Sequence, residues 1–339
     1  MKQYNIAVVG ATGAVGHELL QLLESRNFPV ATLRPLASAR SAGSTVHFQG
    51  KDWTVQEANA DAFGGMDIVF FAATGSLSKE LAPAAAKAGA IVIDKSSTWR
   101  MHPEVPLVVP EINPEALREH KGIIASPNCT TIGLIMALKP LQNLSPMTRV
   151  VVTTLQAVSG TGKEAIEELE AQVEAWQPGQ TEELKHEIYK RQIAFNVLPY
   201  AETFTENGYT TEELKLSAET RKIMGLPNLP VTMTCTRVPV FVGHSESVLV
   251  ETERKITPAE AREAISRFPG VKVVDDPANF VFPTAIDVAG TDETLVGRIR
   301  EDITTPNGLW LWVVSDNLRK GAALNAIQIA EKLVAMGLV

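Results

Sequence analysis

Short apolar runs alternate with helical segments through the first third of the chain. The runs at 6–9, 68–72 and 90–93 contain no polar residue, and segments with helical spacing follow the first two, including an alanine-rich stretch around 81–87. Strands that read as continuous apolar runs are buried on both faces, as in a parallel sheet covered by helices. The pattern predicts an α/β domain built on a parallel sheet.

The pattern changes after about residue 148, where apolar and polar positions begin to alternate in longer strands. One helix of this half has a clear start, with Thr257 as N-cap, Pro258 in the first turn and Glu260 completing a capping box. This half therefore predicts a second, α+β domain. Its predicted strands are 149–158, 231–251, 271–274, 295–300 and 309–315, and its predicted helices are 164–176, 211–224 and 257–268, before a closing helix from 317.

The size and composition of the chain fit a two-domain globular protein, since it has 339 residues of which 45% are hydrophobic and 21% charged. A net charge of −8 argues against nucleic acid or an anionic membrane as a partner. No apolar stretch approaches the roughly 18 residues of a membrane span. With two cysteines and no apolar signal region, we expect a cytoplasmic protein that acts on a small molecule.

A glycine-rich turn joins the first predicted strand to the first predicted helix. The segment 10–16 has the spacing G-x-x-G-x-x-G, a variant of the dinucleotide-binding fingerprint. Glycines permit a tight turn and let backbone N–H groups approach a pyrophosphate at the helix N-terminus. We therefore expect a nicotinamide dinucleotide here. The expected contacts are Gly10, Thr12, Gly13, Ala14 and Val15.

The predicted second strand, 29–37, ends without the acidic residue that usually binds the ribose 2′-hydroxyl of NAD. Ser38, Arg40 and Ser41 follow it instead, and their side chains donate hydrogen bonds suited to a 2′-phosphate. The sequence therefore favours NADP over NAD. The alternative is a solvated loop in which Arg40 binds no ligand.

Cys129 is the candidate nucleophile. Pro127 favours extended backbone before it, and the apolar positions 132, 135, 136 and 138 take helical spacing after it, so Cys129 is predicted at or next to a helix start. Unpaired N–H groups and the positive end of the helix dipole favour the thiolate there. The alternative is a small buried hydrophobe, which is our interpretation of Cys235 in the middle of a predicted strand.

Arg100 and His244 are further candidates. Arg100 follows the strand that ends at 94, at the edge where open α/β sheets bind ligands, and is either an anion clamp or a surface residue beside Trp99. His244 follows a glycine in a polar break between strands. A cysteine beside a nicotinamide cofactor indicates oxidation of an aldehyde through a thiohemiacetal to a thioester, with His244 as base and water or phosphate as the resolving nucleophile.

Six motifs, in order, resemble the aspartate-semialdehyde dehydrogenase family over essentially the whole chain. They are G-A-T-G-A-V-G at 10–16, P-N-C-T-T at 127–131, L-Q-A-V-S-G at 155–160, E-T-R-K at 219–222, R-V-P at 237–239 with G-H at 243–244, and N-L-R-K-G at 317–321. The resemblance implies NADP-dependent reductive dephosphorylation of L-aspartyl-4-phosphate to L-aspartate-4-semialdehyde, through a cysteine thioester. It implies a place in lysine, threonine and methionine biosynthesis, inorganic phosphate as co-substrate of the reverse reaction, and no metal.

The resemblance also implies a role for each site residue. Cys129 carries the acyl group, His244 is the acid and base, and Gln156 orients the substrate. Arg237 binds the substrate carboxylate and Glu219 binds its amino group. The implied phosphate contacts are Arg100, Asn128 and Lys222, with Lys215 sharing the role of Lys222, and the implied further cofactor contacts are Ser159, Gly160 and Asn317.

The family fold implies a Rossmann-type domain at 1–130, completed by the C-terminal helix at 317–339, and a catalytic and dimerisation domain at 131–316 of a homodimer. Two alternatives stay open. An N-acetylglutamyl-phosphate reductase binds a neutral, acylated amine and prefers a glycine before its cysteine, where this chain has Pro127 and Asn128. A non-catalytic NADP-binding protein on the same fold would lack one of the catalytic or carboxylate-binding residues, all of which are present.

Overall fold

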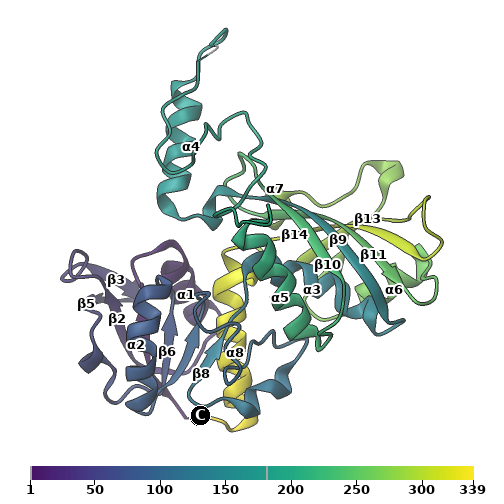
Figure 1. The fold of residues 1–339 in the computed structure, drawn as a ribbon. Helices are drawn as coiled ribbons and strands as arrows, with labels where there is room; N and C mark the ends of the chain where they lie inside the picture. The colour runs from purple at the N-terminus through teal and green to yellow at the C-terminus, as the bar shows by residue number, and fades with distance from the viewer. Residues whose placement is uncertain (1, 181) are drawn as a thin grey trace. The chain divides into compact units, whose positions relative to one another are not determined.

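The computed structural model describes residues 2–180 and 182–339, which form two compact units. Unit 1 comprises Met1–Asn128 with Ala322–Val339, and unit 2 comprises Cys129–Gly321. Unit 1 contains a parallel sheet and unit 2 a mixed sheet, which confirms the predicted fold class (Figure 1). No helix among the described residues is long and apolar enough to cross a bilayer.

Unit 1 is built on a six-stranded parallel sheet in the order β5-β2-β1-β6-β7-β8. Its central strands are apolar except for Asn5 near the start of β1, because both faces are covered. In β1, Ile6 and Val8 face the core cluster that includes α1 and α8, whereas Ala7 and Val9 face the cluster that includes α2. The elements are β1 (Tyr4–Val9), α1 (Ala14–Ser25), β2 (Val30–Ala37), β5 (Gln56–Glu57), β6 (Ile68–Phe71), α2 (Gly75–Lys87), β7 (Ile91–Asp94), β8 (Ile123–Ala125) and α8 (Leu324–Met336).

The C-terminal helix α8 is part of unit 1 (Figure 1). Asn325 Nδ2 donates hydrogen bonds to the carbonyl oxygen of Val108 and to Ser126 Oγ, each at 3.0 Å. Because the asparagine is fully buried, these bonds satisfy donors that have no access to water. They tie the helix to the chain segment that leads to Asn128, the end of the first part of unit 1.

Some elements of unit 1 were not predicted. The helix α2 begins at Gly75, ahead of the predicted alanine-rich stretch. The sequence did not predict this start because the polar residues of the first turn show no helical period. A small hairpin, β3 (Thr45–Phe48) with β4 (Lys51–Thr54), follows β2, and short 3₁₀ helices occur at Ala60–Phe63 and Pro114–Glu119.

Unit 2 is built on a six-stranded mixed sheet in the order β10-β9-β11-β14-β13-β12. β10 runs parallel to β9, and β11 runs antiparallel to both β9 and β14. The helix α3 packs on the sheet and also contacts α5 and α6. The elements are α3 (Cys129–Gln142), β9 (Met147–Gln156), α4 (Lys163–Ala175), α5 (Thr211–Met224), β10 (Val231–Arg237), β11 (His244–Thr252), α6 (Pro258–Ser266), β12 (Val271–Val273), α7 (Ala285–Val288), β13 (Thr294–Glu301) and β14 (Gly308–Ser315), with a π-helical turn at Arg319–Ala323.

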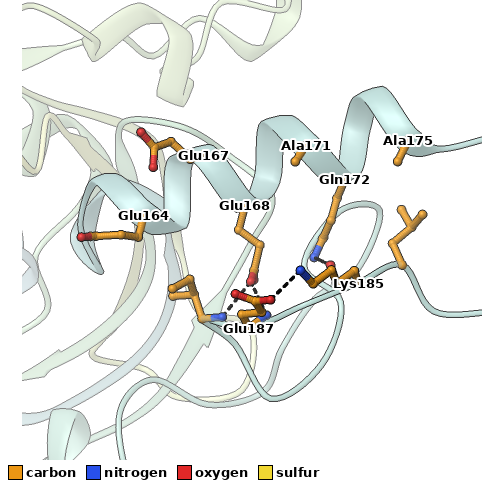
Figure 2. A pocket seen from close by; sticks show the side chains of 10 residues that line it. Glu164, Glu167, Glu168, Ala171, Gln172, Ala175, Lys185 and Glu187 are labelled. Atoms are coloured by element: carbon orange, nitrogen blue, oxygen red, sulfur yellow. Dashed lines mark hydrogen bonds and ion pairs between the residues drawn. The ribbon is translucent and has the colours of Figure 1, made fainter.

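The segment after α4 folds back along that helix (Figure 2). Glu168 of α4 accepts hydrogen bonds from the backbone N–H groups of Ile188 and Tyr189 at 2.7 and 3.3 Å. A cavity of about 560 Å³ lies between the helix and this segment. Its lining includes four glutamates and one lysine, Lys185. Such a lining repels an acyl phosphate or a carboxylate, so we do not place the substrate there.

A polar layer is buried between the sheet of unit 2 and α3. Glu246 of β11 is fully buried, and neither carboxyl oxygen has a hydrogen-bond partner among the described residues, as is also true of Ser315 Oγ. Gly133 of α3 faces these groups, since a Cβ there would lie 2.6 Å from Ser315 Oγ and 3.0 Å from Glu246 Oε1. Burial raises the pKa of Glu246 well above its usual value, because burial penalises the charged form of the carboxyl group.

Glu246→Gln should therefore be more stable than the wild type at high pH, and the difference in stability should grow as the pH rises. A carboxyl whose pKa is higher in the folded than in the unfolded state contributes stability below its usual value of 4.5 and loses that contribution as pH increases. We expect Glu246→Gln to have the higher Tm at about pH 8, with roughly 2–4 °C for each kcal/mol gained, and the gap to close toward about pH 4. Thermal melts of both proteins across this range measure it, and a gap independent of pH would contradict it.

Candidate active site

The reactive side chains of unit 2 gather at one end of its sheet. Cys129 is the first residue of α3 and His244 the first of β11, whereas Gln156 and Arg237 end the parallel strands β9 and β10 as register partners. Cys129 Sγ lies 3.3 Å from His244 Nε2. The predicted helix start at Cys129 is confirmed, and four residues from distant parts of the sequence share one sheet edge.

A backbone hydrogen bond selects the tautomer of His244. The N–H of Ala157 donates to His244 Nδ1 at 3.0 Å. Because an N–H group can only donate, Nδ1 is the acceptor, and the neutral imidazole carries its proton on Nε2. Nε2 therefore donates toward Cys129 Sγ, which suits a thiolate as acceptor. A second proton on Nδ1 would face the N–H of Ala157, so the arrangement favours neutral histidine beside a thiolate.

Gln156 is held by its amide nitrogen. Nε2 donates to Thr130 Oγ1 at 2.9 Å and to Glu212 Oε1 at 3.3 Å, which uses both N–H groups of the amide. Only 1% of the residue is exposed. The direction of the amide group is therefore fixed by its two acceptors.

Arg237 keeps donors available for an anion. It is 7% exposed, and its Nη1 donates to the carbonyl oxygen of Ala157 at 2.7 Å. Its buried Nε has no hydrogen-bond partner among the described residues. Since a guanidinium has five N–H donors in a fixed fork, the remaining ones suit a carboxylate.

Two of the predicted substrate contacts, Glu219 and Lys222, lie one turn apart on α5. Glu219 is 1% exposed and Lys222 is partly buried. Burial lowers the pKa of Lys222, and the nearby Glu219 carboxylate opposes that shift. Lys215, on the same helix, forms an ion pair with Glu202, with Nζ 2.6 Å from Oε1. The charge of Lys215 is thus matched by Glu202.

Ser159 and Asn317 support the turn that precedes His244. Asn317 Oδ1 accepts from the N–H of Gly243 at 2.9 Å, and its Nδ2 donates to Ser159 Oγ at 2.9 Å. Both side chains are buried. In unit 2 these two predicted cofactor contacts thus also hold the backbone from which His244 projects.

Two glycines leave space beside the reactive groups. A Cβ on Gly160 would lie 3.0 Å from Arg237 Nη1 and 3.1 Å from His244 Nε2. A Cβ on Gly321 would lie 2.8 Å from the Cβ of Cys129. Larger residues at either position would displace the nucleophile or its partners.

In unit 1 the predicted glycine loop forms a tight turn between β1 and α1. Gly10 has φ of +84°, and a Cβ there would lie 2.2 Å from the carbonyl oxygen of Ala72. A Cβ on Gly16 would lie 2.1 Å from the carbonyl oxygen of Gly10. Only glycine fits either position, as the dinucleotide-binding turn requires.

The other loop residues open toward solvent. Thr12 and Gly13 are exposed, and Ala14 and Val15 are partly buried at the start of α1. Gly13 is the N-cap and supplies no side-chain hydrogen bond, so backbone N–H groups of the first turn are left for an anion. The donors of this turn fit the pyrophosphate of a nicotinamide dinucleotide.

Ser38, Arg40 and Ser41 follow β2 directly in a turn, in which the N–H of Ser41 donates to the carbonyl oxygen of Ser38 at 2.9 Å. Arg40 is exposed and makes no hydrogen bond or ion pair with the described residues. Its guanidinium thus remains open to a ligand at this edge of the parallel sheet.

Arg100 and Asn128 lie in the loops after β7 and β8 of the same sheet. Both are buried, at 7% and 8% exposure. Arg100 Nε donates to the carbonyl oxygen of Ser126 at 3.1 Å, and its Nη2 donates to that of Lys95 at 2.7 Å. These bonds link the two loops, and Asn128 directly precedes Cys129 in the chain.

Three contributors to the site were not predicted, namely Thr130, Ala157 and Glu212. Ala157 acts through its backbone, which no residue-type pattern reveals. Thr130 and Glu212 contact Gln156. The available signals were the place of Thr130 within the P-N-C-T-T motif and that of Glu212 in the first turn of a predicted helix. No group of three or more histidine, cysteine, aspartate or glutamate side chains suited to a metal ion occurs in the part of the chain that the structure describes.

Two protein-family models match the chain. The semialdehyde dehydrogenase NAD binding domain matches residues 5–120, and the semialdehyde dehydrogenase dimerisation domain matches residues 138–320. Together with a cysteine–histidine pair at a helix start, these matches place the chain in the class of semialdehyde dehydrogenases.

Individual relatives narrow the class. Aspartate-semialdehyde dehydrogenases of Aquifex aeolicus and Bacillus subtilis are 54% and 49% identical to the chain, each over 99% of both sequences. The crystal structure of aspartate semialdehyde dehydrogenase II from Vibrio cholerae complexed with ASA matches with a TM-score of 0.93 at 44% identity over 99% of both chains. The enzyme from Candida albicans with NADP matches with a TM-score of 0.78 at 26% identity over 100% of both. The chain belongs to the aspartate-semialdehyde dehydrogenase family, a family of oxidoreductases.

Replacing His244 with alanine should make Cys129 less reactive. The variant loses the Nε2–H donor that lies 3.3 Å from Sγ, so the thiolate is less stabilised and alkylation by iodoacetamide should slow at neutral pH, with the midpoint of its pH profile moved upward. Stopped-time alkylation followed by peptide mass analysis measures the rate. The matched control is His186→Ala, because His186 contacts Glu183 and is not part of the candidate site. An unchanged pH profile of alkylation in His244→Ala would contradict the assignment.

Proposed function

We propose that the protein interconverts L-aspartate-4-semialdehyde and L-aspartyl-4-phosphate with NADP and inorganic phosphate as co-substrates. In the reductive direction this reaction serves the biosynthesis of lysine, threonine and methionine. The observation that carries the proposal is the placement of Cys129 Sγ 3.3 Å from a histidine nitrogen that bears its proton. The Aquifex aeolicus and Bacillus subtilis relatives and the Vibrio cholerae enzyme complexed with ASA support the substrate.

In the oxidative direction, Cys129 attacks the aldehyde carbon as a thiolate. The Nε2–H of His244 donates a hydrogen bond to the oxygen as negative charge develops, which stabilises the oxyanion of a thiohemiacetal. When hydride leaves the same carbon, the oxyanion re-forms the carbonyl group and a thioester remains on Sγ. A bound nicotinamide cofactor supplies the hydride acceptor.

Phosphate then attacks the thioester carbonyl and displaces the Cys129 thiolate, which is again stabilised by His244. An attacking phosphate beside a substrate carboxylate brings several negative charges together, so cations are needed. Lys222 and Arg237 of unit 2 and Arg100 of unit 1 are proposed for this purpose, with the Asn128 amide as a neutral donor.

The remaining substrate groups have matching side chains in unit 2. The α-carboxylate is assigned to Arg237, whose Nε donor is buried without a partner among the described residues. The α-ammonium group is assigned to the buried carboxylate of Glu219. A free α-ammonium group matches this carboxylate better than the neutral amide of an acylated amine does, which favours the free amino acid as substrate.

We further propose that unit 1 binds the cofactor and that unit 2 carries catalysis and the contact of a homodimer. The dimerisation-domain match over residues 138–320 supports the second assignment. The face of the unit 2 sheet opposite α3 supports it too, because Trp310 and Trp312 of β14 are only partly buried there. The residues proposed to contact the cofactor are the glycine loop and the turn after β2 in unit 1 and, in unit 2, Ser159, Gly160 and Asn317.

The purified protein should reduce NADP⁺ when given L-aspartate-4-semialdehyde and inorganic phosphate, and should need all three. Cys129→Ala should lower kcat by about 10³-fold or more, because no other group forms the thioester. Absorbance at the NADPH band follows the reaction. The matched control is Cys235→Ala, which should keep its activity, and equal rates in Cys129→Ala or without phosphate would sink the proposal.

Arg40→Ala should weaken the use of NADP⁺ but leave NAD⁺ unaffected. Loss of a charge-assisted contact to the 2′-phosphate is expected to raise KM for NADP⁺ about tenfold. Lys51→Ala, an exposed cation of β4 in the same unit, serves as control. Equal efficiency with both cofactors in the wild type, unchanged in Arg40→Ala, would contradict the assignment.

A further inference from the structure

Two consecutive glutamates open α5, and their carboxylates have different partners. Glu213 Oε2 accepts from the N–H of Thr210 at 2.7 Å in a capping box, and its Oε1 accepts from the N–H of Cys235 at 2.9 Å. Glu212 Oε1 is the acceptor for Gln156 Nε2. Glu213 therefore stabilises a helix start and a strand, whereas Glu212 reaches a side chain of the active site.

The contact with Glu212 determines which way the Gln156 amide points. A carboxylate oxygen only accepts hydrogen bonds, so the amide atom 3.3 Å away is the nitrogen. The second N–H of the same nitrogen is used by Thr130 Oγ1 at 2.9 Å. If the amide rotated by half a turn, its oxygen would face the Glu212 carboxylate, which is unfavourable at a residue that is 1% exposed.

We propose that Glu212 is a positioning residue, which together with Thr130 holds both N–H groups of Gln156 so that the amide oxygen is the group presented to the reacting centre. Gln156 then presents its acceptor oxygen to the reacting centre, and it has no N–H group left to donate to the oxyanion.

An acceptor orients the reacting group if the proposed function holds, on which this inference rests. The thiohemiacetal carries an oxyanion at the carbon that loses hydride. His244 Nε2–H donates to that oxygen, whereas the amide oxygen of Gln156 repels it, so the pair fixes the direction of the oxyanion and with it the direction of the carbon–hydrogen bond. Orientation of this kind affects the rate of the chemical step more than the affinity for substrate.

A purely structural role for Glu212 makes a different prediction. An acidic residue in the first turn of a helix stabilises it through the helix dipole, and Glu212 occupies that turn. Two conservative variants separate the roles. Glu212→Asp keeps the charge in the first turn but withdraws the carboxylate from Gln156, and Glu212→Gln keeps the reach and an acceptor oxygen but removes the charge.

If Glu212 positions Gln156, kcat should fall about 10- to 100-fold in Glu212→Asp with KM changed less than about threefold, and Glu212→Gln should keep kcat within about threefold of the wild type. In a Gln156→Ala background, Glu212→Asp should lower kcat by less than about twofold further, since the group through which it acts is gone. Glu213→Gln is the matched control, and should lower Tm without changing kcat.

The proposal is overturned if Glu212→Asp keeps the kcat of the wild type, or if it lowers kcat by the same factor with and without Gln156. It is also overturned if Glu212→Gln loses kcat and Tm while Glu212→Asp keeps both, as a dipole role requires. The wild-type assay with Cys129→Ala tests the proposed function separately, so that function survives if Cys129→Ala is inactive and the Glu212 variants behave as the wild type.

Discussion

The peptide groups of Ala157 hold two charged or titratable side chains of the candidate site, His244 and Arg237. Its N–H donates to His244 Nδ1 at 3.0 Å, and its carbonyl oxygen accepts from Arg237 Nη1 at 2.7 Å. Because both bonds leave one residue at the end of β9, the φ and ψ angles of Ala157 set the distance between the imidazole and the guanidinium. The proton on Nε2 depends on this residue, and so do the proposed thiolate of Cys129 and the proposed place of the substrate carboxylate.

Around that anchor, the site combines fixed donors with fixed acceptors in a region from which water is largely excluded. In the same unit, burial raises the pKa of Glu246 and so disfavours a charged carboxylate between the sheet and α3. Hydrogen bonds are stronger in such surroundings, and unpaired groups cost more. The same low polarity that makes the Cys129–His244 contact effective therefore requires that each amide and imidazole nitrogen have a defined partner, as Gln156 and His244 do.

Local sequence signals predicted the parts of the fold that depend on local physics. The glycine turn at Gly10, the helix start at Cys129 and the capping box at Thr257 all follow from neighbouring residues, and the structure has each of them. The role of Ala157 depends on the register of β9, β10 and β11, which the spacing of one strand does not contain. Glu212 and its neighbour Glu213 look alike in sequence, and only the strands packed against α5 distinguish them. The roles of the site residues themselves stay predictions.

The fold also gives the two cysteines of the chain opposite access. Cys129 is partly exposed, whereas Cys235 is fully buried in β10, where burial raises the pKa of its thiol. An electrophile added to the folded chain therefore forms one adduct, and a second adduct marks a molecule that has opened. A single intact-mass spectrum thus reports both occupancy of the reactive thiol and integrity of the fold, so a screen for covalent ligands carries its own internal standard.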